Sequence, residues 1–157
     1  MQNVTPCLWF NADAEDAATR YVAVLPNSRI LNVSRYGEGA PMPAGTALVV
    51  EVEIDGLRVQ LLNGGPQFPH TEASSLVVRA DTQVELDRIW DALLEGGGEP
   101  SQCGWLKDKW GLSWQVVPSQ LGDWLGGPDA AGAARAMQAM LQMSKFDIQA
   151  LEDAYRG

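Results

Sequence analysis

One strand pattern occurs twice in this chain, and that repetition constrains the fold more than any other feature. Residues 56–62 read GLRVQLL and residues 111–117 read GLSWQVV, so both contain Gly-Leu-x-x-Gln followed by two aliphatic residues. The period-2 geometry of a strand places Ser113 and Gln115 on one face of the second copy and Trp114 on the other. One face is therefore polar at its centre, and the opposite face is apolar.

A second pair of segments supports an internal duplication. Residues 5–10 read as a short buried strand followed by a helix, and residues 75–79 read as a strand that is also followed by a helix. These pairs are offset by about 70 positions, whereas the Gly-Leu-x-x-Gln strands are offset by 55. The first copy contains a longer glycine- and proline-rich loop at 37–45, which accounts for the difference. The sequence therefore predicts two copies of one structural unit.

The order of elements within each copy indicates a βαβββ unit. In the first copy we expect strands at 5–10, 28–36, 48–54 and 57–62, with the Asp55-Gly56 turn between the last two. In the second copy we expect strands at 75–79, 103–107 and 112–117. Two further helices are predicted after the second copy, at about 129–143 and at 147–155.

Both predicted internal helices begin at residues that can cap a helix. Asn11 and Asp13 precede the first helix and offer side-chain caps. Thr82, with Glu85 three residues later, forms the pattern of a capping box. We therefore expect local side chains to satisfy the first backbone N–H groups of each helix.

The charge of the chain excludes two classes of partner. The net charge is -9, and nucleic acids and anionic membranes are bound through clustered Lys and Arg.

The longest apolar runs are only of strand length, and residues 1–4 do not begin a signal peptide, so we expect no membrane association. Two cysteines, Cys7 and Cys103, fit a reducing compartment, and the expected location is the cytoplasm.

Five segments together carry a resemblance to a known family. They are TPCLWF, AEDAATRYVAVLPNS, LLNGGP, CGWLKDKWGLSWQVVP and MQAMLQMSKFDIQALEDA, and they cover nearly all of the chain. With these segments the chain resembles the PhnB-like branch of the vicinal oxygen chelate superfamily, the glyoxalase and bleomycin-resistance proteins. The resemblance implies an α+β fold in which two paired βαβββ modules form a curled mixed-sheet cup, with the ligand inside the cup and with homodimers common.

The resemblance also suggests how the chain is divided. We expect a single vicinal oxygen chelate domain over residues 1–157. Module one then covers about 4–65, module two covers about 72–118, and a C-terminal helical extension covers 128–157.

In metal-dependent relatives, the resemblance implies four ligands that point into the cup. The matching positions here lie near Thr5, at Gln60, near Ser75 and at Gln115. Neutral amides and hydroxyls cannot replace the carboxylates and imidazoles that transition metals require, so we predict no metal. His70, the only histidine, lies in the segment 63–71 that joins the two copies, and it is expected to face solvent or to be bonded within the core.

Seven residues are the candidate ligand contacts. An amide can both donate and accept, which suits the orientation of a ligand in an apolar cup, although two such amides could equally bond each other or water. Cys103 has no histidine nearby in sequence, which favours an inert thiol, and Asn63 is expected at the rim of the cup. The predicted ligand-binding set is Gln60, Gln115, Trp9, Trp105, Asn63, Ser75 and Cys103.

Three functions are compatible with these features, and none of them identifies a catalytic residue. The first is a metal-independent small-molecule-binding protein of this superfamily, whose reaction is unknown. The second is a drug-sequestering protein of the resistance type, in which an acidic homodimer holds a cationic antibiotic. The third is a methyltransferase, because members of the branch often carry a demethylubiquinone methyltransferase label. The chain has no glycine-rich loop after its first strand, so we predict no nucleotide-like cofactor.

Overall fold

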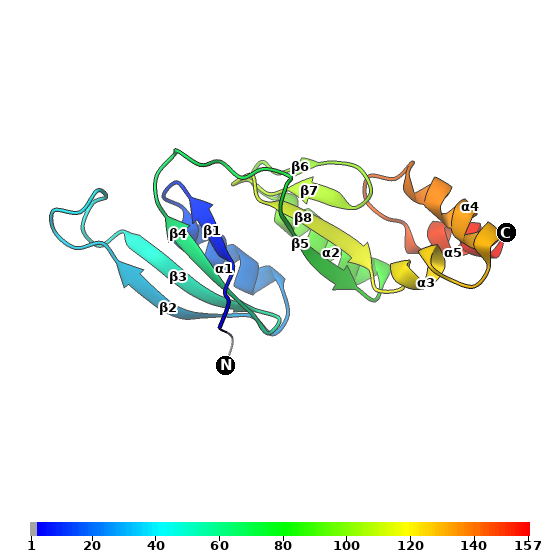
Figure 1. The fold of residues 1–157 in the computed structure, drawn as a ribbon, viewed down its shortest axis with the longest axis horizontal. Coiled ribbons are helices and arrows are strands. Elements are labelled where there is room, and N and C mark those ends of the chain that lie inside the picture. Colours follow the sequence, from blue (N-terminus) through cyan, green and yellow to red (C-terminus); the bar gives the residue numbers. More distant parts are fainter. Residues whose placement is uncertain (1–2) are drawn as a thin grey trace. The chain divides into compact units, whose positions relative to one another are not determined.

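The computed structural model describes residues 3–157 and divides into two compact units, one ending at His70 and one running from Thr71 to Gly157 (Figure 1). Each unit contains a four-stranded mixed sheet with a helix over one face. We call the opposite face of each sheet its open face.

Unit one follows the order strand, helix and three strands. Its sheet has the strand order β1-β4-β3-β2; β1 is parallel to β4, and the other neighbours are antiparallel. Its elements are β1 (Cys7–Phe10), α1 (Ala14–Val24), β2 (Arg29–Arg35), β3 (Ala47–Ile54) and β4 (Leu57–Asn63).

The core of unit one lies between α1 and the sheet. Val50, Val52 and Leu61 are fully buried on the helix-facing side. Alternation places Glu51 and Gln60, which are paired across β3 and β4, on the open face. The helix meets the sheet through small residues and Tyr21, which is also fully buried.

Unit two repeats this arrangement. Its sheet has the order β5-β8-β7-β6, in which β5 is parallel to β8. Its elements are β5 (Ser75–Ala80), α2 (Gln83–Leu94), β6 (Glu99–Pro100), β7 (Trp105–Lys107) and β8 (Ser113–Pro118). Trp114 is 1% exposed and lies on the helix-facing side with Leu106 and Val116. The prediction that Trp114 points toward the helix, away from Gln115, is confirmed.

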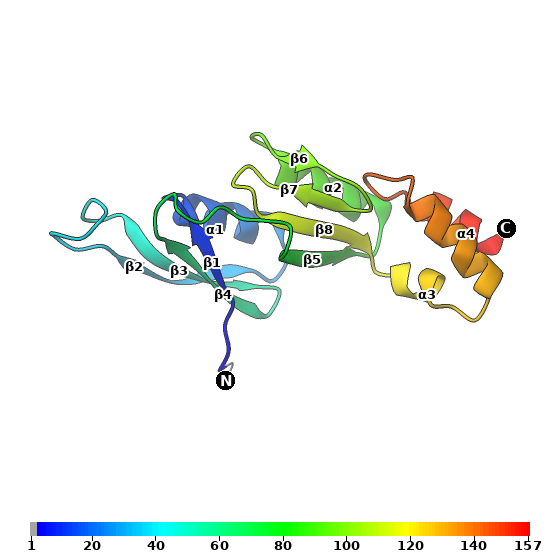
Figure 2. The same cartoon turned by 45° about the horizontal axis from the view of Figure 1, so that its top comes forward.

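Three helices complete unit two: α3 (Leu121–Leu125), α4 (Ala130–Met140) and α5 (Ile148–Arg156). Figure 2 shows α4 and α5 beside each other at the C-terminal end of this unit. Ala136, Leu151 and Phe146, which lies in the segment between the two helices, are buried. Among residues 3–157, no helix is both long enough and apolar enough to cross a membrane.

The predicted α+β fold with two βαβββ modules and C-terminal helices is confirmed. The short strand β6 and the short helix α3 were not predicted. The strand expected at 103–107 begins only at Trp105, because Cys103 and Gly104 have φ angles of 55° and 78°. These left-handed conformations are incompatible with a strand.

The two helix starts differ from each other. The predicted Thr82 cap is confirmed, because Thr82 Oγ1 accepts from the backbone N–H of Glu85 at 3.2 Å. The Glu85 carboxylate reaches back as expected, but it accepts from the N–H of Asp81, one residue before the cap, at 3.1 Å. The predicted cap from Asp13 is wrong, because its side chain makes no capping hydrogen bond. Asn63 Oδ1, from β4, accepts from the N–H of Ala14 at 2.9 Å and takes that place.

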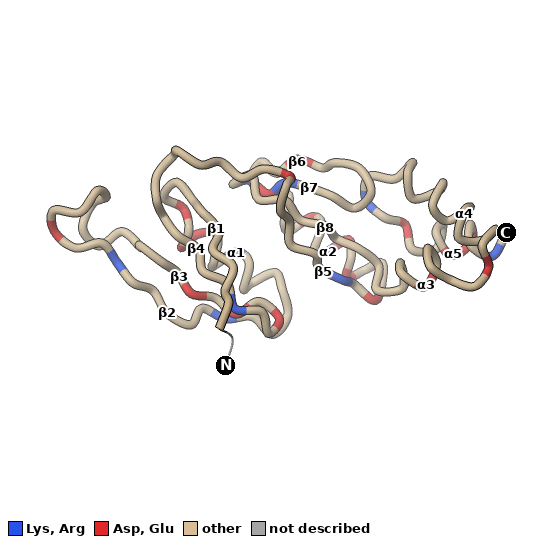
Figure 3. Tube along the Cα trace, in the orientation of Figure 1, with Lys and Arg blue, Asp and Glu red and all other residues tan. Residues whose placement is uncertain are grey.

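Charged residues are interspersed along both units (Figure 3). Arg and Lys side chains form ion pairs in both units, and most of the paired groups are substantially exposed. Such pairs contribute little to the stability of the fold. The Glu72–Lys107 pair is the one that matters for the site described next.

Candidate functional site: a cavity in unit two

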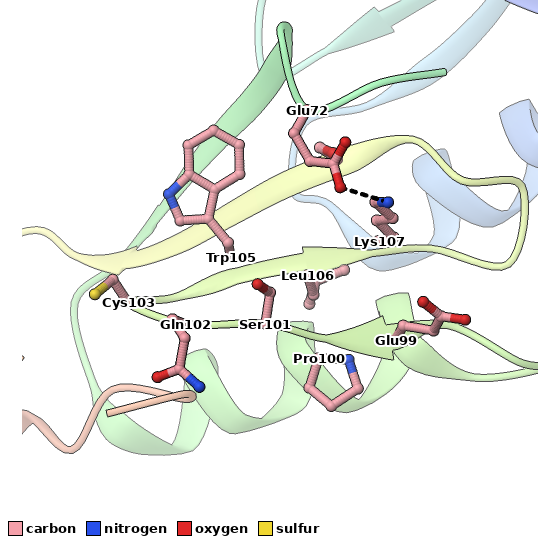
Figure 4. A pocket seen from close by; sticks show the side chains of 10 residues that line it. Glu72, Glu99, Pro100, Ser101, Gln102, Cys103, Trp105, Leu106 and Lys107 are labelled. Carbon is pink, nitrogen blue, oxygen red and sulfur yellow. Dashed lines mark ion pairs between the residues drawn. The ribbon is translucent and has the colours of Figure 1, made fainter. Parts of the chain in front are cut away.

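A cavity of about 470 Å³ opens on unit two, which is within the size range of small-molecule sites (Figure 4). Strand β7 and the segment that precedes it form most of the wall. The lining residues are Glu72, Glu99, Pro100, Ser101, Gln102, Cys103, Trp105, Leu106, Lys107 and Ser113.

Ser113 is the most unusual lining residue. It is 1% exposed, and its Oγ has no hydrogen-bond partner among the described residues. Buried polar groups are almost always hydrogen-bonded, because an unpaired group costs about 1–3 kcal/mol. Register places Ser113 opposite Ser75 on one side and Lys107 on the other, so its side chain belongs to the open face. A ligand atom in the cavity could supply the missing partner.

Trp105 and Gln115 are direct partners across β7 and β8, on the same open face as Ser113. Gln115 Nε2 donates to Ser75 Oγ at 2.9 Å. The structure therefore brings together three of the residues predicted from sequence, namely Trp105, Gln115 and Ser75. Only Trp105 of these three lines the cavity itself.

Two residues of the cavity lining form an ion pair: Glu72, which lies just before β5, and Lys107 on β7. Lys107 Nζ lies 2.5 Å from Glu72 Oε1. The hydrogen bond from Lys107 lowers the pKa of the Glu72 carboxyl, and the same bond raises the pKa of Lys107. Glu99 also lines the cavity and is paired with Lys107 across β6 and β7. The lining thus contains two carboxylates and one ammonium group, which leaves one negative charge in excess.

Cys103 lines the cavity from the segment before β7. Its thiol donates to the carbonyl oxygen of Met140 at 3.6 Å. Both Cys103 and Cys7 are free thiols, and Cys7 is exposed on β1.

The turn that joins β7 to β8 is held by a buried carboxylate. Asp108 is 4% exposed, and its oxygens accept from the N–H groups of Trp110 and Leu112 and from the indole Nε1–H of Trp114, at 2.9, 3.1 and 3.0 Å. Asp108 is thus buried although both of its neighbours in sequence, Lys107 and Lys109, are charged. This network orients both strands that carry Trp105 and Ser113.

Gln60 lies on the open face of unit one. It lines a small cavity of about 90 Å³ together with Thr5, Glu51 and Arg58, among others. Gln60 Nε2 donates to Glu51 Oε1 at 3.4 Å, which is at the weak end of hydrogen bonding. The local surroundings of Gln60 are thus charged, in contrast to those of Gln115.

Trp9 also lies on the open face of unit one, where β1 pairs Trp9 with Leu62. Its indole Nε1–H donates to the carbonyl oxygen of Gly65 at 2.8 Å, and its ring meets Phe68 edge to face with centroids 5.0 Å apart. A Cβ at Gly64 would lie 2.2 Å from the Trp9 ring, so only glycine fits there. Trp9 therefore packs against the segment that follows β4, through Gly65 and Phe68.

Asn63 and His70 both lie against the core of unit one. Asn63 is fully buried; its Nδ2 donates to the carbonyl oxygen of Ala47 at 2.9 Å, while its Oδ1 caps α1. The structure thus places Asn63 in the core, where both ends of its amide are hydrogen-bonded. The His70 ring packs edge to face against Phe10, with centroids 5.0 Å apart.

The four positions that correspond to metal ligands do not fit a transition metal. Gln60 and Gln115 each use the amide nitrogen as a donor, to Glu51 and Ser75 respectively. What remains is neutral amide and hydroxyl oxygen, which binds transition metals poorly. Within residues 3–157, no three His, Cys, Asp or Glu side chains are grouped so as to hold a metal ion.

Sequence reasoning did not select four of the lining residues that define the chemistry of the cavity: Ser113, Lys107, Glu72 and Glu99. A signal for Ser113 was present, because alternation already placed it on the same face as Gln115. Lys107 follows Trp105 at the strand period of two. Glu72 and Glu99 carried no such signal, since neither belongs to a predicted strand.

Comparisons with known proteins identify the family. The model of the 3-demethylubiquinone-9 3-methyltransferase family matches residues 2–117 of this chain. The PhnB protein from Bacillus cereus is similar in structure, with a TM-score of 0.70 and 29% sequence identity; the match covers 75% of this chain and 100% of that chain. A search of curated proteins found no match.

Two further solved structures share the fold at lower identity. A protein from Pseudomonas aeruginosa has a TM-score of 0.61 at 20% identity, with 75% of this chain and 98% of that chain covered. The fosfomycin resistance protein FosX from Listeria monocytogenes, complexed with Mn(II) and sulfate, has a TM-score of 0.54 at 13% identity, with 80% and 98% covered. This chain therefore belongs to the 3-demethylubiquinone-9 3-methyltransferase family.

Proposed function

We propose that this protein binds a small organic molecule, without a transition metal, in the cavity of unit two. The observation that carries the proposal is the buried hydroxyl of Ser113, which has no partner among the described residues and borders the cavity next to Trp105 and Lys107. Trp105 offers an aromatic surface, while Ser113 offers one hydrogen-bonding group. Gln115 and Ser75 extend the same face, and Cys103 borders it.

The charge of the cavity favours a ligand with a cationic group. Lys107 is engaged by Glu72, which leaves the second carboxylate, Glu99, for a positive charge, and an indole such as that of Trp105 also attracts cations. This supports sequestration of a cationic compound as the second candidate function. A methyltransferase is the third, and only the family name supports it.

Three further predictions accompany this proposal. Gln60 and Trp9 remain predicted ligand contacts of unit one, and the cytoplasm remains the proposed compartment because both cysteines are free thiols.

A homodimer is proposed because Met137 and Leu141 expose apolar surface on and after α4, at 40% and 55%. Light scattering should then give about twice the chain mass of 17.0 kDa.

A thermal-shift screen tests the proposal, because a ligand that binds only the folded state raises its melting temperature. The panel should contain benzyltrimethylammonium, benzyl alcohol, phenylacetate and S-adenosylmethionine, so that positive, neutral and negative aromatic groups are compared. We expect the positively charged compound to stabilise the protein most. Stabilisation by S-adenosylmethionine alone would instead favour a methyltransferase.

Variants assign any binding to the cavity. Replacing Trp105 with Leu should abolish the shift, and Ser113→Ala should weaken binding of any ligand that pairs with the hydroxyl. Trp110→Leu is the matched control, because Trp110 lies outside the cavity lining, with Lys109 Nζ 4.5 Å from its ring centroid. Binding that survives Trp105→Leu and Ser113→Ala unchanged would place the site elsewhere.

A further inference from the structure

The helices that follow residue 117 lie beyond the part of the chain that the family model matches. The Bacillus cereus structure is covered in full by 75% of this chain. Helices α3, α4 and α5 therefore lie outside the residues that the family model matches. The segment between α4 and α5, residues 141–147, is hydrogen-bonded to residues that line the cavity of unit two, and we call it the α4–α5 connector.

Three hydrogen bonds join this connector to one wall of the cavity. The N–H of Cys103 donates to the carbonyl oxygen of Met143 at 2.8 Å, and the N–H of Gly104 donates to that of Ser144 at 2.7 Å. Ser144 Oγ donates to the carbonyl oxygen of Ser101 at 2.5 Å. Ser101 and Cys103 both line the cavity, so the connector holds lining residues directly.

The wall adopts a conformation that needs such support. Cys103 has a φ of 55°, which is unfavourable for a residue with a Cβ, and Gly104 follows with a φ of 78°. A Cβ at Gly104 would lie 2.5 Å from the ring of Phe146 and 2.8 Å from the carbonyl oxygen of Val116. The wall thus fits closely between β8 and the buried Phe146 of the connector. A strained backbone persists only where its surroundings hold it.

The connector is itself anchored on its other side by α2. Gln83 Nε2 donates to the carbonyl oxygen of Phe146 at 3.0 Å, and Gln83 Oε1 accepts from the N–H of Ile148 at 2.9 Å. Lys145 forms an ion pair with Asp87 at 2.8 Å. The α4–α5 connector therefore links two parts of unit two, the helix α2 and the wall that precedes β7.

We propose that the α4–α5 connector is a positioning element of the cavity, and that it fixes the Ser101–Gly104 wall and through it the affinity for the ligand. The effect on ligand affinity rests on the proposed function, whereas the role of the α4–α5 connector in holding the wall does not. Ser144 is the residue that tests it best, because its side chain bonds the wall while its backbone can stay in place in a variant.

The first experiment needs no ligand. In a Cys7→Ser background, Cys103 is the only thiol of the chain, and its alkylation by iodoacetamide reports opening of the wall. Ser144→Ala removes one hydrogen bond, so alkylation should accelerate about fivefold, and the amides of Cys103 and Gly104 should exchange hydrogen faster by a similar factor. Ser144→Thr should restore both rates, because it restores the hydroxyl.

A matched control separates positioning from general destabilisation. In unit one, Ser28 Oγ donates to the carbonyl oxygen of Pro26 at 2.8 Å and accepts from the N–H of Asp55 at 3.2 Å. Ser28→Ala therefore removes the same kind of bond, and one more, at a distance from the wall in sequence. It should leave the alkylation rate of Cys103 unchanged. Equal rates in wild type and Ser144→Ala, or equal acceleration by Ser28→Ala, would overturn the proposal.

The second experiment measures the dissociation constant of benzyltrimethylammonium by calorimetry. Ser144→Ala should raise this dissociation constant about fivefold, the same factor as the expected increase in the alkylation rate of Cys103. Ser144→Thr should restore the wild-type dissociation constant. An unchanged constant alongside faster alkylation would overturn the link between wall and ligand. If wild type does not bind this probe, the proposed cation preference fails, while the alkylation and exchange rates still decide whether the connector holds the wall.

Discussion

Gln115 Nε2 donates a hydrogen bond to Ser75 Oγ at 2.9 Å, between the two parallel strands β8 and β5. Gln115 is thus already oriented by the protein, which leaves its amide oxygen as the group that can accept from a ligand. A preoriented amide next to Trp105 distinguishes the open face of unit two from that of unit one, where Gln60 bonds a carboxylate.

Replacing Gln115 with Leu should weaken ligand binding more than it weakens the fold. The change removes an amide while approximately keeping its volume, so a ligand group that relied on it loses about 1–3 kcal/mol. That corresponds to a roughly five- to hundredfold loss of affinity, measurable by calorimetry. Gln149→Leu on α5 is the matched control, because it removes an exposed amide that donates to Asp153 Oδ1 at 2.8 Å and lies outside the cavity lining. Unfolding of the Gln115→Leu protein with intact affinity in the folded fraction would make Gln115 a purely structural amide.

Replacing Asp108 should destabilise the whole of unit two. Its carboxylate satisfies three N–H groups, those of Trp110, Leu112 and the Trp114 indole, and Asp108→Ala would leave them without it. We expect a loss of about 3 kcal/mol or more in the free energy of unfolding, measured by urea denaturation. Asp91, which is exposed on α2, provides the control, because Asp91→Ala should change stability by less than about 0.5 kcal/mol. Equal effects at the two sites would refute the role of Asp108.

The N-terminus of α1 offers a paired test of capping from a distance. Asn63→Ala would remove the acceptor for the N–H of Ala14 and the donor to the carbonyl oxygen of Ala47, both in the core. We expect a loss of about 2–3 kcal/mol in the free energy of unfolding. Asp13→Ala should cost much less, since Asp13 makes no side-chain cap. A larger cost for Asp13→Ala than for Asn63→Ala would show that the local residue caps the helix after all.

The Glu72–Lys107 pair predicts a specific pH dependence. Lys107 holds the pKa of Glu72 below its ordinary value of about 4.5, so the pair stabilises the fold above that pH and this contribution is lost as the pH falls through the lowered pKa. Lys107→Met should raise the pKa of Glu72 toward its ordinary value in an NMR titration. The stability difference between wild type and Lys107→Met should shrink in acid below pH 4.5.

A second ion pair provides the control for that titration. Lys145 lowers the pKa of Asp87 through a hydrogen bond, at an Nζ–Oδ1 distance of 2.8 Å. Lys145→Met should therefore raise the pKa of Asp87 and leave that of Glu72 where it is. If Lys107→Met leaves the Glu72 titration unchanged, the ion pair across the cavity does not form in solution.

Metal removal should have no effect on this protein. The positions that correspond to metal ligands offer only neutral amide and hydroxyl oxygens, which bind transition metals poorly. Dialysis against EDTA should leave the melting temperature unchanged, and elemental analysis should find no stoichiometric metal. One equivalent of zinc, nickel or manganese per chain would contradict this prediction.

Local chemistry was readable from the sequence wherever neighbours along the chain decide the outcome. Alternation in GLSWQVV placed Trp114 against the helix and Gln115 on the opposite face, because the strand period is a property of the backbone. The Thr82–Glu85 capping box was predicted for the same reason, since its atoms lie within one turn. The repeated Gly-Leu-x-x-Gln pattern likewise predicted two βαβββ modules.

Only the tertiary structure decided where distant groups meet. α1 is capped by Asn63, which lies 49 residues after Ala14, so Asp13 was the wrong local choice. Asp108 is buried because three N–H groups converge on it, which its charged neighbours did not indicate. Cys103 leaves the strand conformation at the point where a carbonyl group of the α4–α5 connector accepts from its N–H, and this carbonyl lies 40 residues away in sequence. Sequence patterns report the backbone period, whereas hydrogen-bond partners across the fold depend on packing, which no single segment contains.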